Sequence, residues 1–322
     1  MVAAFVAVLA LPGGLFGSVQ PAGGELLVSG STTGNTCISV TVAPASFRQT
    51  GELRGSCARP RRSAYPVVPV MIPDPRSQRQ SVRIAHVGTS TTYGPVVMRF
   101  EDGSDTRPVY AYGPGSLWLY DVDTERGSEL LRFSSSTGRL LQTVVMPRLF
   151  RPVIAADDVG LYLIAAVNGG VSGPAPAALY YVAPGARHAV VIHREGRAAL
   201  WITAHGTTVW TEIVSGTGDA SLWRFDGRRG RLLWRGRIGP APVAIFGAGT
   251  LWAVTPVWAA RYSGDCTRVK VSQIDAITGR QKTIATIPAS GYCSLLLDPQ
   301  GLTYFKGAFY FLDGSRLYRV RT

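Results

Sequence analysis

A motif of alternating strands and glycine turns returns along this chain at nearly constant intervals. The turns at Gly138, Gly185, Gly230 and Gly279 follow one another after 45 to 49 residues, and the runs between them alternate apolar and polar side chains. Such alternation predicts strands with one buried face, and glycine supplies the positive φ that a tight β-turn needs. The spacing therefore predicts an all-β chain made of one repeated unit.

Each repeat also contains an apolar strand, a turn and a strand with a large aromatic residue. These aromatic residues are Trp118, Tyr162, Trp210 and Trp252, and they keep the same spacing. A repeat of roughly 40 to 50 residues with four short strands is typical of a β-propeller blade. One four-stranded sheet cannot bury both faces alone, so blades stack and each aromatic residue fills the gap to the next blade. We therefore expect these aromatic residues in the core.

The repeat divides the chain into blades of four antiparallel strands. Complete blades are expected near residues 105–147, 150–194, 198–238 and 241–288. The C-terminal residues supply three strands of a further blade, and an N-terminal strand, first of all "ELLVSG" (Glu25–Gly30), would supply the fourth. Residues 25–81 form an irregular, proline-rich first part, so six blades are favoured and seven remain open. The prediction is a single β-propeller, with clear repeats over residues 82–322, closed by an N-terminal strand.

The first 24 residues carry no charged side chain. Their apolar run "VAAFVAVLAL" has the length of the hydrophobic region of a signal peptide and is short for a full membrane span. No Lys or Arg precedes the run, and no clean A-x-A cleavage site follows it. We expect residues 1–24 to be a signal peptide or membrane anchor, with a buried edge strand as the alternative. The protein is then extracellular or part of the cell envelope.

Four cysteines fit an exported protein. They are Cys37, Cys57, Cys266 and Cys293, and their even number favours disulfides over free thiols. Three pairings are open, and proximity in the sequence favours Cys37 with Cys57 and Cys266 with Cys293. Each such bond would stabilise the fold by about 3 kcal/mol in the chain-entropy model. No Cys-x-x-Cys or paired Cys/His spacing suggests a metal site.

The charge of the chain is strongly positive. The formal net charge of +13 comes from 30 arginines and three lysines, which are scattered apart from a run around Arg54, Arg59, Arg61 and Arg62. No nucleic-acid motif accompanies them, so nucleic acid is an unlikely partner. A basic exterior fits anionic glycans, lipid head groups or a cell wall. We expect a monomer whose partner is a protein or an anionic ligand of the envelope.

The "G-x-LW" strand and the "T-G-R" hairpin carry a family resemblance. With them, residues 82–322 resemble the quinoprotein-like and YVTN-like β-propellers, and more closely the exported propeller proteins of actinobacteria. Quinoprotein dehydrogenases would imply a quinone cofactor, calcium and a vicinal cysteine pair, and the chain has no vicinal cysteines. Virginiamycin-lyase-like propellers would imply magnesium with histidine and glutamate, and only His193 and Glu195 lie near each other, without the lyase motif. The resemblance therefore implies a fold, and we expect no cofactor.

Aligning the repeats places an arginine just before the first strand of three blades. These are Arg107, Arg151 and Arg197. Equivalent positions lie on a ring around a propeller channel, so three guanidinium groups would converge on one carboxylate, sulfate or phosphate. The alternative is that each arginine pairs with a local acid such as Asp105 or Glu195. No Ser/His/Asp spacing, nucleophile elbow or phosphate-binding glycine loop is present, so no catalytic residue is predicted.

These features predict a non-catalytic binding or interaction module at the cell envelope, with an anionic ligand as the favoured partner. Two alternatives stay open. One is an envelope enzyme, a quinoprotein-like dehydrogenase or a lyase, with its site at the channel mouth. The other is a structural scaffold.

Overall fold

The computed structural model describes residues 4–22, 24–31, 37–55, 67–73, 79–86, 92–101, 109–123, 127–147, 149–167, 177–195, 198–214, 220–237, 243–258, 266–289 and 301–322. These residues form 27 β-strands. The chain falls into two compact units. Unit 1 combines residues 1–64 with residues 238–322, and unit 2 holds residues 65–237.

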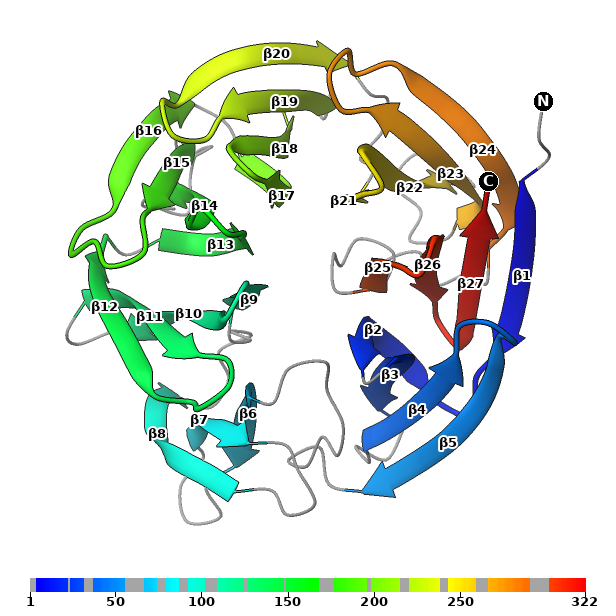
Figure 1. Ribbon diagram of the computed structural model, residues 1–322, viewed down its shortest axis with the longest axis horizontal. Helices are drawn as coiled ribbons and strands as arrows, with labels where there is room; N and C mark the ends of the chain where they lie inside the picture. Colours follow the sequence, from blue (N-terminus) through cyan, green and yellow to red (C-terminus); the bar gives the residue numbers. More distant parts are fainter. Residues whose placement is uncertain are drawn as a thin grey trace. The chain divides into compact units, whose positions relative to one another are not determined.

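Unit 2 contains three four-stranded antiparallel sheets and one three-stranded sheet (Figure 1). The first four-stranded sheet consists of β9 (Val109–Gly113), β10 (Ser116–Asp123), β11 (Gly127–Ser134) and β12 (Leu140–Met146). The second consists of β13 (Leu149–Ala156), β14 (Leu161–Val167), β15 (Ala177–Val182) and β16 (Val190–Glu195). The third consists of β17 (Ala198–His205), β18 (Thr208–Val214), β19 (Ala220–Asp226) and β20 (Arg231–Arg237). The three-stranded sheet is β6 (Val67–Pro73), β7 (Arg79–His86) and β8 (Thr92–Glu101). The expected blades near 105–147, 150–194 and 198–238 are confirmed as four-stranded sheets.

Unit 1 contains three four-stranded antiparallel sheets. The first consists of β2 (Leu15–Ala22), β3 (Glu25–Ser31), β4 (Cys37–Ala43) and β5 (Arg48–Gly55). The second consists of β21 (Val243–Gly247), β22 (Thr250–Trp258), β23 (Cys266–Asp275) and β24 (Gln281–Pro288). The third, the C-terminal sheet, consists of β25 (Leu302–Phe305), β26 (Ala308–Asp313) and β27 (Arg316–Arg321) together with β1 (Phe5–Ala10). The blade expected near 241–288 is therefore confirmed as a sheet as well.

The described residues thus form seven sheets, where the sequence favours six blades. The additional sheet is β2 to β5, which lies in a part of the chain that shows no clear repeat. Close packing in this sheet requires a glycine at position 30. A Cβ atom on Gly30 would collide with the backbone of Leu15 on the paired strand. The sheet was not expected because residues 15–22, which form β2, belong to the segment that the sequence predicts to be a leader or anchor.

The strand that completes the C-terminal sheet is β1. It pairs with β27 in antiparallel register, from Phe5 opposite Arg321 to Ala10 opposite Arg316. The prediction that "ELLVSG" supplies this strand was wrong, because residues 25–30 lie in β3 of another sheet. Residues 1–24, expected to be a leader or anchor, contain the whole of β1 and β2. None of the described residues belongs to a helix long and apolar enough to cross a bilayer.

The repeated aromatic residues are buried, as expected. Trp118, Tyr162, Trp210 and Trp252 occupy the same position in the second strands of their sheets, and each is less than 5% exposed. Burying a side chain of this size contributes about 2 to 3 kcal/mol. The repeated aromatic residues therefore serve the packing of the sheets, and functional residues have to be sought at other positions.

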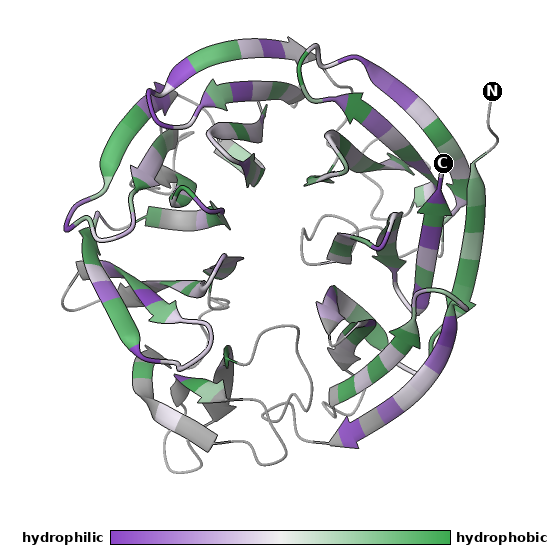
Figure 2. Ribbon diagram, viewed as in Figure 1, coloured by the Kyte–Doolittle hydropathy of each residue, from purple (hydrophilic) through white to green (hydrophobic). Residues whose placement is uncertain are grey.

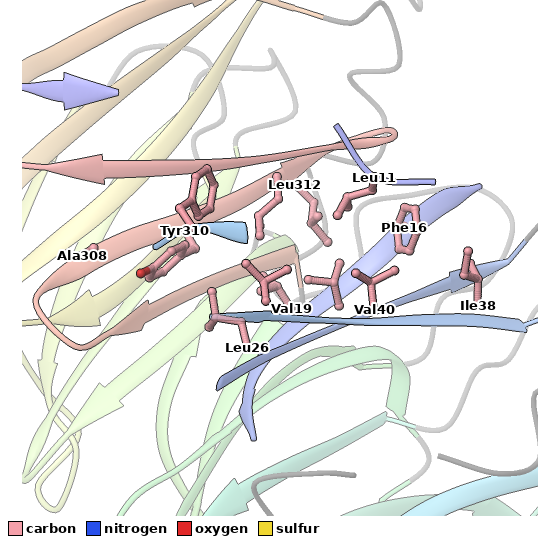
Figure 3. Close-up of a cluster of buried hydrophobic side chains, with 13 residues drawn as sticks. Leu11, Phe16, Val19, Leu26, Ile38, Val40, Ala308, Tyr310 and Leu312 are labelled. Atoms are coloured by element: carbon pink, nitrogen blue, oxygen red, sulfur yellow. The ribbon is translucent and has the colours of Figure 1, made fainter. Parts of the chain in front are cut away.

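Unit 1 has a core of its own between β2 to β5 and the C-terminal sheet. Its buried members include Leu11, Phe16, Val40, Tyr310 and Leu312 (Figure 3). Residues of β1 pack against this cluster from one side. The N-terminal residues are thus joined to the C-terminal sheet by side-chain packing as well as by the backbone ladder.

In unit 2 the first strands β9, β13 and β17 contact one another, β13 lying between the other two. The fourth strands β12, β16 and β20 lie at the opposite edge of each sheet (Figure 1). An edge strand has unpaired backbone groups and a solvent-facing surface. The side chains on these edges are therefore available to a partner.

Candidate functional site

The predicted arginine ring falls largely outside the described residues. Arg107 and Arg197 are not among them, and only the backbone of Arg151 is described. That backbone lies inside β13, at the register shift between Phe150 and Val153, and not ahead of the first strand as expected. Convergence of the three guanidinium groups stays a prediction.

The cysteine pairing also stays a prediction, because Cys57 and Cys293 are outside the described residues. Cys37 is the first residue of β4 and lies opposite Gly55, two residues before Cys57 in the sequence. Cys266 is the first residue of β23 and is buried. No cysteine in the described part of the chain carries a free thiol.

The histidine with a glutamate neighbour does not form a metal site with described side chains. His193 lies in β16, and its ring packs against Phe225, with 4.8 Å between ring centroids, and against Trp223 at 6.0 Å. Within the described ranges, no three His, Cys, Asp or Glu side chains are placed to hold a metal ion. The ring of His193 thus serves the packing of β16 on β19.

A buried acid is the most unusual group in the described core. Glu212 in β18 is fully buried, and its Oε2 accepts a hydrogen bond from Nε1 of Trp201 in β17 at 2.7 Å. Its Oε1 has no partner among the described residues. The adjacent Thr211 donates from its hydroxyl to the carbonyl oxygen of Trp201 at 2.6 Å. One carboxyl group is therefore held between two strands with half of its hydrogen-bonding capacity unused.

Burial raises the pKa of the Glu212 carboxyl from its ordinary value to about 8, because the charged form would lose its hydration. The hydrogen bond from Trp201 favours the charged form and only partly opposes this shift. At neutral pH the group is mostly a neutral carboxylic acid. A catalytic pair needs a second acid, base or nucleophile within hydrogen-bond reach, and the indole of Trp201 cannot act as one.

A strip of exposed arginines is a feature that sequence reasoning missed. It lies on the edge strands β16 and β20 and on the turns that precede them. We call it the basic strip, and it consists of Arg187, Arg194, Arg228, Arg229, Arg231 and Arg235. None of these guanidinium groups pairs with a carboxylate of a described residue. Six exposed arginines therefore lie along one edge of unit 2.

Contacts between neighbouring sheets make the basic strip continuous. The turn between β19 and β20 packs so closely on β16 that a Cβ atom on Gly230 would collide with the carbonyl group of Ile192. The acid at this turn, Asp226, has its Oδ1 occupied by the backbone N–H groups of Arg228 and Arg229, at 3.1 and 3.2 Å. The turn is thus fixed on β16, and its one carboxylate stabilises the backbone.

Comparison with solved structures identifies the fold. No family model and no curated protein matches the sequence. The β-propeller domain of the Trilobed protease from Pyrococcus furiosus aligns with a TM-score of 0.61 at 10% identity, over 97% of this chain and 93% of that one. The WD40 domain of coronin from Toxoplasma gondii aligns at 0.56 with 10% identity, over 99% and 86%. Sqt1 from Saccharomyces cerevisiae aligns at 0.55 with 11% identity, over 98% and 97%.

This chain has a β-propeller fold. Propellers carry many unrelated functions, so the function has to be argued from the residues of this one.

In a propeller, equivalent positions of successive blades show which residues are structural and which depart from the repeat. The ladders of the second and third strands align Glu212 with Tyr120, Ile164 and Val254, all buried. Trp201 likewise occupies the place of Val109, Val153 and Val243 in the first strand, each nine residues before the repeated aromatic residue. Both members of the Trp201–Glu212 pair therefore differ from the aliphatic or aromatic residues at the equivalent positions of the other sheets.

The sequence alone reveals the basic strip more readily than the Trp201–Glu212 pair. Six arginines fall within residues 224–237, and this run contains more arginines than the one around Arg54. A simple count along the sequence would have found it. The Trp201–Glu212 pair was visible only as a deviation within the aligned repeats, and its burial needed the structure.

Proposed function

We propose that this propeller is a non-catalytic binding module for an anionic partner at the cell envelope. The observation that carries the proposal is the basic strip, whose guanidinium groups are exposed and unpaired by described carboxylates. Like charges on one hairpin repel each other and lower stability. A partner with negative charge compensates that cost and gains bidentate hydrogen bonds to arginine.

Sequence composition around the basic strip supports the same function. The segments 134–147, 182–195 and 226–237, which hold the edge strands and their turns, contain eight arginines and only two acids, Glu195 and Asp226. Such a one-sided distribution produces a local positive potential that attracts an anionic partner and speeds its association.

Further parts of the proposal concern assembly and location. We propose that the seven sheets are the blades of one propeller, closed where β1 pairs with β27. We keep Arg107, Arg151 and Arg197 as a second anion site. We also propose an oxidising compartment such as the envelope, because the chain has an even number of cysteines.

The proposal is tested by binding to a soluble polyanion. A variant with R228Q, R229Q, R231Q and R235Q should bind dextran sulfate about thirty-fold more weakly than the unchanged protein, taking about 0.5 kcal/mol per lost contact. The matched control is R268Q, K270Q, R280Q and K282Q, which removes the same charge from exposed positions of β23, β24 and the turn that joins them.

The readout is the dissociation constant at several salt concentrations. The strip variant should also show a weaker dependence of binding on salt. Equal losses in the two variants would mean that binding follows net charge alone, and the proposal would be wrong. Replacing Arg107, Arg151 and Arg197 with Ala tests the second site separately.

A further inference from the structure

We infer that the anionic partner of the basic strip is the surface of a lipid bilayer. The inference rests on the proposed function and adds a second observation, which is apolar. Side chains of Leu, Val and Arg meet on the edge strands of unit 2, and a membrane interface is the anionic surface that accommodates all of them.

The apolar part of this surface lies on β12 and β16. Leu140 is 49% exposed, Leu141 41%, Val145 67% and Val190 57%. Figure 2 shows the apolar stretches on these two strands. Edge strands normally carry charged or polar side chains, which keep them from pairing with other proteins. The solvent-facing positions of β12 are Leu140, Leu141, Thr143 and Val145, and none is charged.

The apolar and basic parts belong to one surface. A β-bridge joins Val145 of β12 to His188, which lies between Arg187 and Val190. The side chain of Gln142 binds the turn before β16 through three hydrogen bonds. Its Nε2 donates to the carbonyl oxygens of Ala183 and Ala186 at 3.1 and 2.6 Å, and its Oε1 accepts from the N–H of Gly185 at 2.9 Å.

These hydrogen bonds fix the position of β12 relative to the turn before β16, and the packing of the Gly230 turn fixes β20 relative to β16. The surface therefore runs from leucine and valine on β12 to arginine on β20. Exposed side chains cover it, and the edges of three successive sheets contribute them.

The chemistry distinguishes a bilayer from other anionic partners. A glycan or nucleic acid would contact the arginines but would leave the aliphatic side chains in water. Lipid head groups neutralise arginine, while the boundary with the acyl chains takes up leucine and valine. Trp234 in β20 is partly exposed beside Arg235, as is typical of residues at a membrane interface.

The test uses the full chain and lipid vesicles. The protein should sediment with vesicles of phosphatidylcholine and phosphatidylglycerol, and should not sediment with phosphatidylcholine alone. The first variant replaces Leu140, Leu141, Val145 and Val190 with Thr, which retains the strand preference and removes apolar surface. Vesicle binding should fall at least about tenfold, and dextran sulfate binding should be unchanged.

The second variant is the fourfold arginine-to-glutamine change of the basic strip. It should weaken binding to both vesicles and dextran sulfate, at about five-fold per arginine for the vesicles. The control with R268Q, K270Q, R280Q and K282Q should retain vesicle binding.

Each other outcome is decisive. Binding to dextran sulfate without binding to vesicles leaves the proposed function standing and overturns the lipid inference, in favour of a glycan, a nucleic acid or an acidic protein. Vesicle binding that is unaffected by the threonine variant overturns it as well. A dimer in light scattering that this variant dissociates assigns the apolar surface to a second copy of the chain. Binding to neither probe refutes both proposals.

Discussion

Replacing Glu212 with Gln should change how the stability of the protein depends on pH. In the folded chain the pKa of Glu212 is raised to about 8, and in the unfolded chain the carboxyl has its ordinary value of about 4.5. Below pH 4.5 both states hold the proton, so the stabilising effect of the neutral acid is fully present. As the pH rises towards 8, the unfolded chain releases the proton while the folded chain keeps it, and stability falls.

The size of this effect follows from proton linkage. One proton that is bound in the folded state only costs about 1.4 kcal/mol for each pH unit. Over the whole window the loss amounts to about 5 kcal/mol. Glutamine has a similar shape, accepts the same hydrogen bond from Trp201 and does not titrate. The free energy of unfolding of the E212Q variant, relative to that of the unchanged protein, should therefore rise by about 3 kcal/mol between pH 5 and pH 7.

The assay is urea unfolding at half-unit steps from pH 5 to pH 8, followed by tryptophan fluorescence and by circular dichroism. Both signals should give the same transition, since only then is a single free energy defined. The E129Q variant makes the same chemical change at an exposed position of β11 and serves as the control. Parallel pH profiles for E212Q and the unchanged protein would refute the reasoning, because they would show that Glu212 is charged in the folded state.

Three further outcomes follow from the packing. Gly230→Ala should lower the free energy of unfolding by about 2 kcal/mol or more, because the residue has a φ of +63° and a Cβ would collide with β16, whereas Gly185→Ala, at +82° in open space, should cost about 1 kcal/mol. Gln142→Ala should cost about 2 kcal/mol, because three hydrogen bonds to the turn before β16 are lost, and hydrogen exchange should accelerate at that turn. A chain that begins at Glu25 lacks β1 and β2, so its thermal midpoint should fall sharply or the protein should aggregate; an unchanged midpoint would show that these strands are dispensable.

The repeat made much of the fold predictable. The sheets from β9 to β24 begin and end within a few residues of the expected limits, because each is a local meander whose alternation and glycine turns are written in adjacent residues. The aromatic residues were correctly assigned to the core for the same reason. The sheet of β2 to β5 was missed, since the apolar character of residues 1–24 favoured a leader or anchor although they contain β2, and the strand at residues 25–30 was assigned to the C-terminal sheet.

The candidate sites divide along a similar line. The arginines of residues 224–237 are a local run that the sequence displays, but the exposure of Arg228, Arg229, Arg231 and Arg235 depends on β20 being an edge strand. The burial of Glu212 depends on the packing around it. Neither property is encoded by neighbours in the sequence, since both depend on which residues from distant segments surround a position.

By itself the sequence determined the class of the protein, a chain of repeated antiparallel sheets with aromatic residues between them. Period and turn chemistry act over a few residues, and they need no knowledge of the rest of the chain. Only the tertiary structure decided that residues 5–10 form the last strand of the C-terminal sheet, more than 300 residues away. It also decided that leucine, valine and arginine meet on one edge. Such pairings depend on long-range contacts, whose entropic cost is compensated only when the whole chain has folded.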